Sequence, residues 1–169
     1  MDSKDDFANS HVPQQEIGEQ MDAVEKRAFE TEEAAIAFFA LAKDRLLNVN
    51  QWAVLAGSEL SKFQLTNAFG NQIEGLAKEG DYVKIDIPGP GSSTGKGFDW
   101  VFVEAVVEER EVGMEAVTLR ARPTANPLSN NKDTAHFLTD QATSTFQVKR
   151  VGRYIYVEEH GRNELANAY

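Results

Sequence analysis

The chain of 169 residues contains no cysteine. Disulfides, thiolate metal ligands and cysteine nucleophiles are therefore excluded. Only three histidines are present, and no apolar run approaches the roughly 20 residues that a membrane-spanning helix needs. The first residues are polar and acidic, with no apolar segment behind them. We therefore expect no signal peptide, no membrane contact and a cytoplasmic location.

The excess of acidic residues is concentrated near the N-terminus. The net charge is −10. Residues 1–33 hold ten Asp and Glu against three Lys and Arg, a balance of −7, which leaves −3 for residues 34–169. An acidic segment of this kind favours solubility and disfavours nonspecific contact with nucleic acid. Nucleic acid is therefore not an expected partner.

The sequence predicts two regions, an acidic N-terminal segment over 1–28 and a single β-rich domain over 29–169. Residues 1–12 are polar and aperiodic, which predicts disorder. A narrow apolar stripe at spacings of four, three and four residues follows, formed by Ile17, Met21, Val24 and Ala28. The stripe predicts a short helix. This helix would either dock on its own domain or bind a partner, so a monomer and a homodimer through the N-terminal segment both remain open.

A stronger helix is predicted over 34–47. Thr31 is a favourable N-cap, and Glu32 and Glu33 suit the positive end of the helix dipole. The apolar face includes Phe38 and Phe39 and is wide, as expected of a helix that packs on a core.

From residue 51 onward the sequence predicts mainly strands. Apolar and polar residues alternate in several short segments separated by Gly, Pro and Asn. A short strand is predicted over 52–55, and the terminal segments around 146–157 predict a hairpin. The expected core residues are Phe38, Phe39, Val83, Ile85, Val101, Phe102, Val103, Val117, Leu119 and Phe146.

This pattern indicates an α+β fold that is predominantly antiparallel β. We expect six or seven strands in a curled sheet or small barrel, with one N-terminal amphipathic helix packed on it. A helix-grip (START-like) fold is the alternative. That fold normally ends in a long C-terminal helix, and residues 158–169 lack an apolar stripe.

The glycine-rich loop over 88–97 has features of a phosphate-binding loop, but its spacing is wrong. Three residues separate Gly91 from the Gly-Lys pair instead of four, and Gly97 follows Lys96 where Ser or Thr is needed. We expect a binding loop above a fixed sheet instead. Lys96 would contact an anion, while Asp99 and Trp100 would supply an acceptor and a flat apolar surface at its rim.

Two histidine–carboxylate pairs are candidates for acid–base chemistry. His136 and Asp140 are four residues apart, as are His160 and Glu164. In a helix each pair would share a face, and a carboxylate can orient an imidazole as a general base. Two such pairs also offer nitrogen and oxygen ligands to a metal, although no secure metal or cofactor motif is present.

Arg162 and Asn163 are further candidates for binding, through a carboxylate and an amide or hydroxyl respectively. No nucleophile-elbow sequence is found. The sequence favours a binding module that holds a small molecule or a protein in an apolar sheet pocket under loop 88–97. The alternative is a small hydrolase or isomerase that uses the histidine–carboxylate pairs, either alone or together with a metal.

Overall fold

The computed structural model describes residues 7–55, 62–87 and 94–168. Its strands are β1 (Glu19–Ala28), β2 (Lys62–Thr66), β3 (Tyr82–Asp86), β4 (Asp99–Glu111), β5 (Met114–Pro123), β6 (Thr143–Val151) and β7 (Tyr154–Glu164). Its helices are α1 (Glu32–Leu47), the short α2 (Trp52–Leu55) and two 3₁₀ turns, η2 (Asn9–His11) and η3 (Val49–Gln51).

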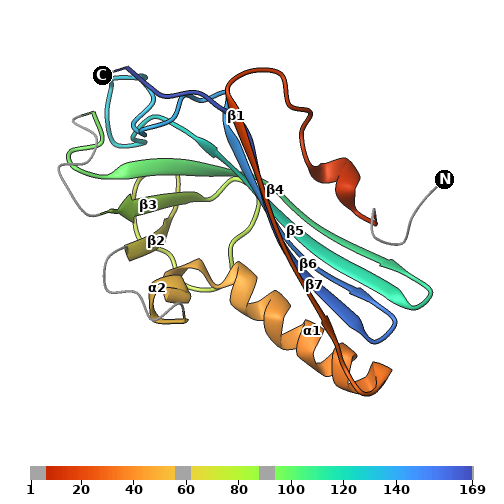
Figure 1. The fold of residues 1–169 in the computed structure, drawn as a ribbon. Coiled ribbons are helices and arrows are strands. Elements are labelled where there is room, and N and C mark those ends of the chain that lie inside the picture. The colour runs from red at the N-terminus through yellow and green to blue at the C-terminus, as the bar shows by residue number, and fades with distance from the viewer. Residues whose placement is uncertain (1–6, 56–61, 88–93, 169) are drawn as a thin grey trace.

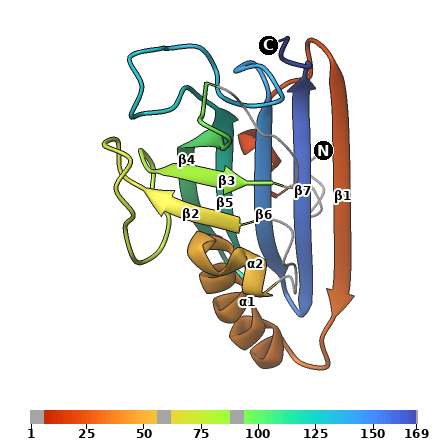
Figure 2. The same ribbon diagram turned by 90° about the vertical axis from the view of Figure 1, so that its left-hand side faces the viewer.

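The strands form one antiparallel sheet in the order β1-β7-β6-β5-β4-β3-β2. The sheet twists so strongly that β2 and β3 run almost across the direction of β7 and β1 (Figures 1 and 2). A register shift between Val103 and Ala105 interrupts the β4–β5 ladder. The ends of the sheet, β1 and β2, do not pair. The α+β prediction with mainly antiparallel strands is confirmed, in the form of an open curled sheet and not a barrel.

Helix α1 forms where the sequence predicts it. The Thr31 side chain accepts a hydrogen bond from the Ala34 amide at 3.1 Å, and two glutamates occupy the first turn. This cap satisfies one of the amides that a helix N-terminus leaves without a partner.

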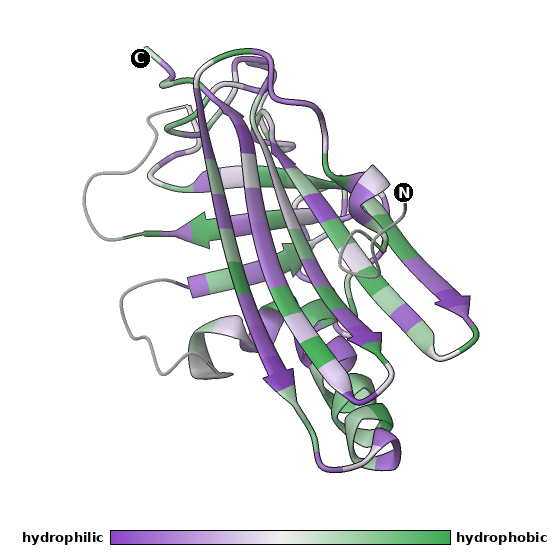
Figure 3. Cartoon of the chain, turned by 45° about the vertical axis from the view of Figure 1, so that its right-hand side comes forward, coloured by the Kyte–Doolittle hydropathy of each residue, from purple (hydrophilic) through white to green (hydrophobic). Residues whose placement is uncertain are grey.

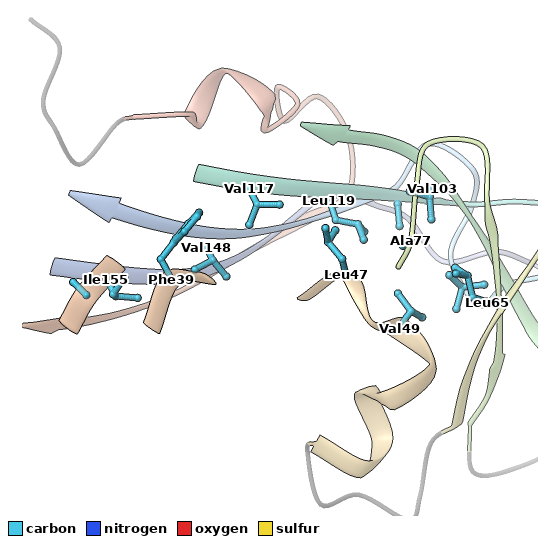
Figure 4. Close-up of a cluster of buried hydrophobic side chains, with 13 residues drawn as sticks. Phe39, Leu47, Val49, Leu65, Ala77, Val103, Val117, Leu119, Val148 and Ile155 are labelled. Atoms are coloured by element: carbon cyan, nitrogen blue, oxygen red, sulfur yellow. The ribbon is translucent and has the colours of Figure 1, made fainter. Parts of the chain in front are cut away.

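One face of the sheet, here called the inner face, packs on α1. Phe39 and Leu47 from the helix meet Val117, Leu119 and Val148 from the strands (Figure 4). The other expected core residues are buried or packed against this cluster, except Phe102. Its ring packs edge-on against Tyr82, with centroids 5.2 Å apart, away from the core cluster. The prediction that Phe102 belongs to the core was wrong. Both faces of β4 are apolar in sequence, so alternation does not indicate which face is buried in the core.

The opposite, outer face of the sheet carries polar side chains. It is covered by residues 7–17, here called the N-terminal strap, which crosses it between η2 and β1 (Figures 1 and 3). Gln147 donates to the Ala8 carbonyl at 2.8 Å, and Lys149 donates to Asn9 at 2.5 Å. The prediction of disorder over 1–12 is therefore wrong for residues 7–12, while residues 1–6 lie outside the described chain.

Two local predictions are also wrong. Residues 19–28 of the predicted helix form the strand β1 instead, because β7 offers a full ladder of backbone partners from Met21 to Ala28. The segment 52–55 is the helical turn α2, which continues directly from η3. Both are cases in which contacts distant in sequence override a local pattern.

The C-terminal part of the described chain contains no helix. Strand β7 extends to Glu164, and Leu138 bridges to Ala166 beyond it. The long C-terminal helix of the helix-grip alternative is therefore absent from residues 165–168. No helix among the described residues has the length and apolar character needed to cross a membrane.

Candidate functional site

A cavity of about 120 Å³ opens on the inner face of the sheet. It lies beside the end of α1, between the strands, the η3–α2 turn and the loop that follows β5. Most of its walls are aliphatic or aromatic side chains. The lining residues are Val49, Trp52, Phe63, Val83, Ile85, Val101, Leu119, Ala121, Pro123, His136, Leu138, Ala142, Ser144 and Phe146.

Three aromatic rings form one wall of this inner-face cavity. Trp52 from α2 lies with its ring centroid 5.4 Å from Phe63 of β2 and 5.4 Å from Phe146 of β6. Tilted and edge-on pairs at this separation are favourable beyond the area that they bury. The Trp52 indole donates to the Leu46 carbonyl at 3.0 Å. Its N–H is therefore already used, and Trp52 presents an apolar surface to the cavity.

His136 supplies most of the polarity of the cavity. Its side chain is buried and its ring stacks on Phe137, with centroids 4.5 Å apart. Burial lowers the pKa of His136 to about 4, because the charged imidazolium loses hydration in this surrounding. The ring is therefore neutral at pH 7.

The hydrogen bonds of His136 assign its tautomer. Its Nδ1 accepts a hydrogen bond from the Leu138 amide at 3.0 Å, so this nitrogen carries no proton. In the neutral ring the proton is then on Nε2, which is left as a donor. Ser144, on the inner face of β6, is the other polar side chain of the lining.

Asp99 lies next to His136 at the start of β4. It is 1% exposed, and its cross-strand neighbour Ile85 lines the cavity. The carboxylate oxygen Oδ2 is 4.0 Å from His136 Nε2, too far for a hydrogen bond. A closer carboxylate would raise the pKa of the imidazole, but at this distance burial outweighs it.

The structure brings His136 and Asp99 together and separates the pairs predicted from sequence. Asp140 is exposed, and its carbonyl accepts from Arg122. His136 lies in an irregular segment and not in a helix, so the spacing of four residues has no structural meaning there.

His160 lies on strand β7, and its ring contacts Asp22 and Glu158 instead of Glu164. Its Nδ1 is 2.5 Å from Asp22, and its Nε2 is 2.8 Å from Glu158. Glu158 also pairs with the buried Lys149 at 3.0 Å. The hydrogen bond with His160, assisted by Arg162, lowers the pKa of Asp22. This network ties β1, β6 and β7 together on the outer face, away from the cavity.

The remaining binding candidates do not line the cavity. Lys96 is exposed in the turn over 94–97, and residues 88–93 of the predicted binding loop lie outside the described chain. Trp100 is 2% exposed and faces away from the cavity-lining Val101, since neighbouring residues of a strand point to opposite faces. Asn163 accepts hydrogen bonds from the amides of Glu16 and Ile17.

Arg162 and Asn163 therefore hold the N-terminal strap and β1. Arg162 pairs with Asp22 at 2.8 Å. Among the described residues there is no group of three or more histidine and acidic side chains arranged to hold a metal ion.

The aromatic wall of the cavity was missed in the sequence. Phe63 and Phe146 alternate with polar neighbours, so their inward orientation could be predicted from the sequence. Their contact with Trp52 could not be predicted, because it joins three segments that are distant in sequence. Likewise, no spacing rule connects Asp99 with His136.

Comparisons with known proteins identify no family. No family model matches the sequence, and no curated protein matches it. Among solved structures, the chain is similar to a hypothetical protein from Helicobacter pylori. The identity is 10%, the likeness covers 85% of this chain and 67% of that one, and the TM-score is 0.45. At this identity and TM-score the likeness supports no inference about function.

Proposed function

We propose that this protein binds a small, neutral and mainly apolar molecule in the inner-face cavity. The observation that carries the proposal is an apolar cavity whose lining contains a buried, neutral imidazole. Ligand sites typically combine apolar walls with a few polar groups that fix the orientation of the ligand.

The volume of the cavity sets the size of the ligand. An engineered apolar cavity of about 150 Å³ in another protein binds benzene. The inner-face cavity, at about 120 Å³, is of the same order. A molecule built on one ring, or a branched chain of similar volume, matches it.

The charge of the lining favours a neutral ligand. None of the lining residues is a lysine, arginine, aspartate or glutamate, and His136 is uncharged at pH 7. A charged ligand would lose its hydration without gaining an opposite charge among the lining residues. An anionic ligand is therefore disfavoured.

The tautomer of His136 defines the polar part of the ligand. Because Nδ1 is occupied by the Leu138 amide, the available group is the Nε2–H donor. A ligand oxygen that accepts this hydrogen bond, in a hydroxyl or carbonyl group, satisfies it. The expected ligand is therefore an apolar ring or chain with one oxygen.

Phenol, toluene and benzoate are suitable probes of this site. Trp52 lines the cavity, so ligand entry is expected to change its fluorescence. The variant Trp100→Phe leaves Trp52 as the sole tryptophan. Phenol is expected to bind about tenfold more tightly than toluene, in line with one hydrogen bond, and benzoate is expected not to bind.

Two substitutions of His136 provide matched controls for this titration. His136→Phe keeps a ring but removes the donor, and it should reduce the affinity for phenol to that for toluene. His136→Gln keeps a donor and should retain the preference for phenol. Tight binding of benzoate, or a phenol preference that survives in His136→Phe, would refute the proposed site.

A hydrolase or isomerase that uses a histidine–carboxylate pair is the second candidate. The observation in its favour is the Asp99 carboxylate 4.0 Å from His136 Nε2. The orientation of the ring counts against a general base, because Nδ1 is blocked and Nε2 carries the proton. Hydrolysis of phenyl acetate that disappears in His136→Gln would favour this candidate over simple binding.

A further inference from the structure

Strand β1 forms one long edge of the sheet, and no described segment pairs with that edge. All ten of its residues are exposed, and β7 is its only partner among the described residues. In an antiparallel ladder each strand directs alternate backbone groups to either side. About half of the amides and carbonyls of β1 therefore face away from β7 along its free edge (Figure 2).

The other edge of the sheet is protected by the chain itself. β2 has five residues, and the Leu65 amide donates to the Asn50 side chain at 2.7 Å. The Leu65 carbonyl accepts from the Ile73 amide at 2.9 Å, and Thr66 bridges to Gln72. Unprotected edges are sites at which another strand can add, and proteins commonly shorten or cover them. In contrast, no described segment pairs with the free edge of β1.

The residues of β1 are suited to a second copy of the same strand. In an antiparallel pair, two residues that lie opposite each other both point their backbone N–H and C=O groups toward the partner strand, or both point them away. In a pair of identical strands, the two-fold axis must therefore pass between two copies of the same residue, which face each other. An axis at Asp22 would place two aspartates opposite each other, and an axis at Glu25 would place two glutamates opposite each other. Like charges in directly opposite positions are destabilising.

An axis at Val24 gives the most favourable pairing of the central positions. Val24, which is 53% exposed, then faces the Val24 of the second copy. Asp22 faces Lys26 on both sides of the axis, so opposite charges meet twice. An axis at Ala23 instead sets Asp22 against Val24. It also relies on Glu19, which lies beyond the register shift between Glu19 and Met21.

We propose that two copies of this chain associate through β1, antiparallel, with the two-fold axis at Val24. The two sheets then join into one continuous sheet, with both α1 helices on the same face. This interface is independent of the inner-face cavity. It rests on a single pair of strands, so the dimer is expected to be weak and concentration-dependent.

Sedimentation velocity over a range of concentrations tests for the dimer. Val24→Lys places two ammonium groups opposite each other and should weaken the dimer about tenfold or more. Val112→Lys is the matched control, since Val112 is 100% exposed at the β4–β5 turn and far from this edge. A protein that stays monomeric at every concentration, or a dimer that Val24→Lys leaves unchanged, would overturn the proposal.

Cysteine cross-linking tests the register. Because the chain has no cysteine, Val24→Cys introduces a single thiol. Opposite Cβ atoms in a strand pair lie about 4.5–5.5 Å apart, so Val24→Cys should form a disulfide-linked dimer readily under mild oxidation. Ala23→Cys should cross-link slowly, because Ala23 would face Glu25 of the other copy. Faster cross-linking of Ala23→Cys would reject the axis at Val24.

Discussion

At the scale of single residues, the charge and polarity of the cavity lining depend on His136. The residue is 7% exposed and its ring is uncharged at neutral pH, and the ring accepts a hydrogen bond from a backbone amide. Two influences on the pKa of His136 oppose each other, since the nearby Asp99 carboxylate favours the charged imidazolium and burial disfavours it. Burial dominates because the carboxylate is 4.0 Å away, outside hydrogen-bond range.

We expect His136 to make the stability of the fold depend on pH. An unfolded histidine has a pKa of about 6.5, and the folded pKa is lowered to about 4. Between these values the unfolded state binds more protons, so stability falls as the pH decreases from about 7 to about 4. The loss attributable to His136 is up to about 3 kcal/mol.

Urea unfolding of the wild type and of His136→Gln at pH 7 and pH 4.5 measures this effect. Glutamine does not titrate and retains an oxygen that can accept from the Leu138 amide. The variant should lose less stability than the wild type on acidification. Equal losses in the two proteins would show that His136 is not buried in its neutral form.

At the scale of elements, the sequence predicted α1 and most of the strands from local patterns, and it missed the strand β1, which depends on pairing with β7. Thr31 and the two glutamates after it identify the start of α1 without knowledge of the rest of the chain. The stripe of Met21 and Val24 is compatible with a helix, but a strand forms because β7 supplies backbone partners. Alternation identified most inward-facing residues of β3 and β5, yet it could not connect His136 with Asp99.

The N-terminal strap is an element whose role only the structure revealed. Gln147 and Lys149 are both 1% exposed, and each donates to the strap. Arg120 donates to the His11 carbonyl at 2.9 Å, and the His11 ring contacts Glu109. These contacts tie residues 8–11 to three strands.

Deleting residues 1–12 is therefore expected to destabilise the protein. Four contacts would be replaced by hydration, at a net cost of about 1–2 kcal/mol, or a decrease of several degrees in Tm. Deleting residues 1–6 is the matched control, because the difference between the two truncations isolates residues 7–12. Identical Tm values for the two truncated proteins, measured by differential scanning calorimetry, would contradict this role of the strap.

At the scale of the whole molecule, the open sheet separates two environments. The inner face carries the apolar core (Figure 4) and the cavity next to it. The outer face carries ion pairs, among them that of Glu158 with Lys149, which also donates to the strap. In the part of the chain that the structure describes, β1 pairs with β7 on one side and with no strand on the other. The fold thus places a candidate ligand site and a candidate dimer edge in separate regions, so each can be tested without disturbing the other.

A crystal structure of the protein soaked in phenol tests directly whether the inner-face cavity holds a small apolar ligand. We expect the ring in the inner-face cavity against Trp52, with its oxygen within hydrogen-bond distance of His136 Nε2. Phenol bound elsewhere with the cavity unchanged, or a cavity closed by the side chains of Phe63 and Phe146, would contradict ligand binding in this cavity.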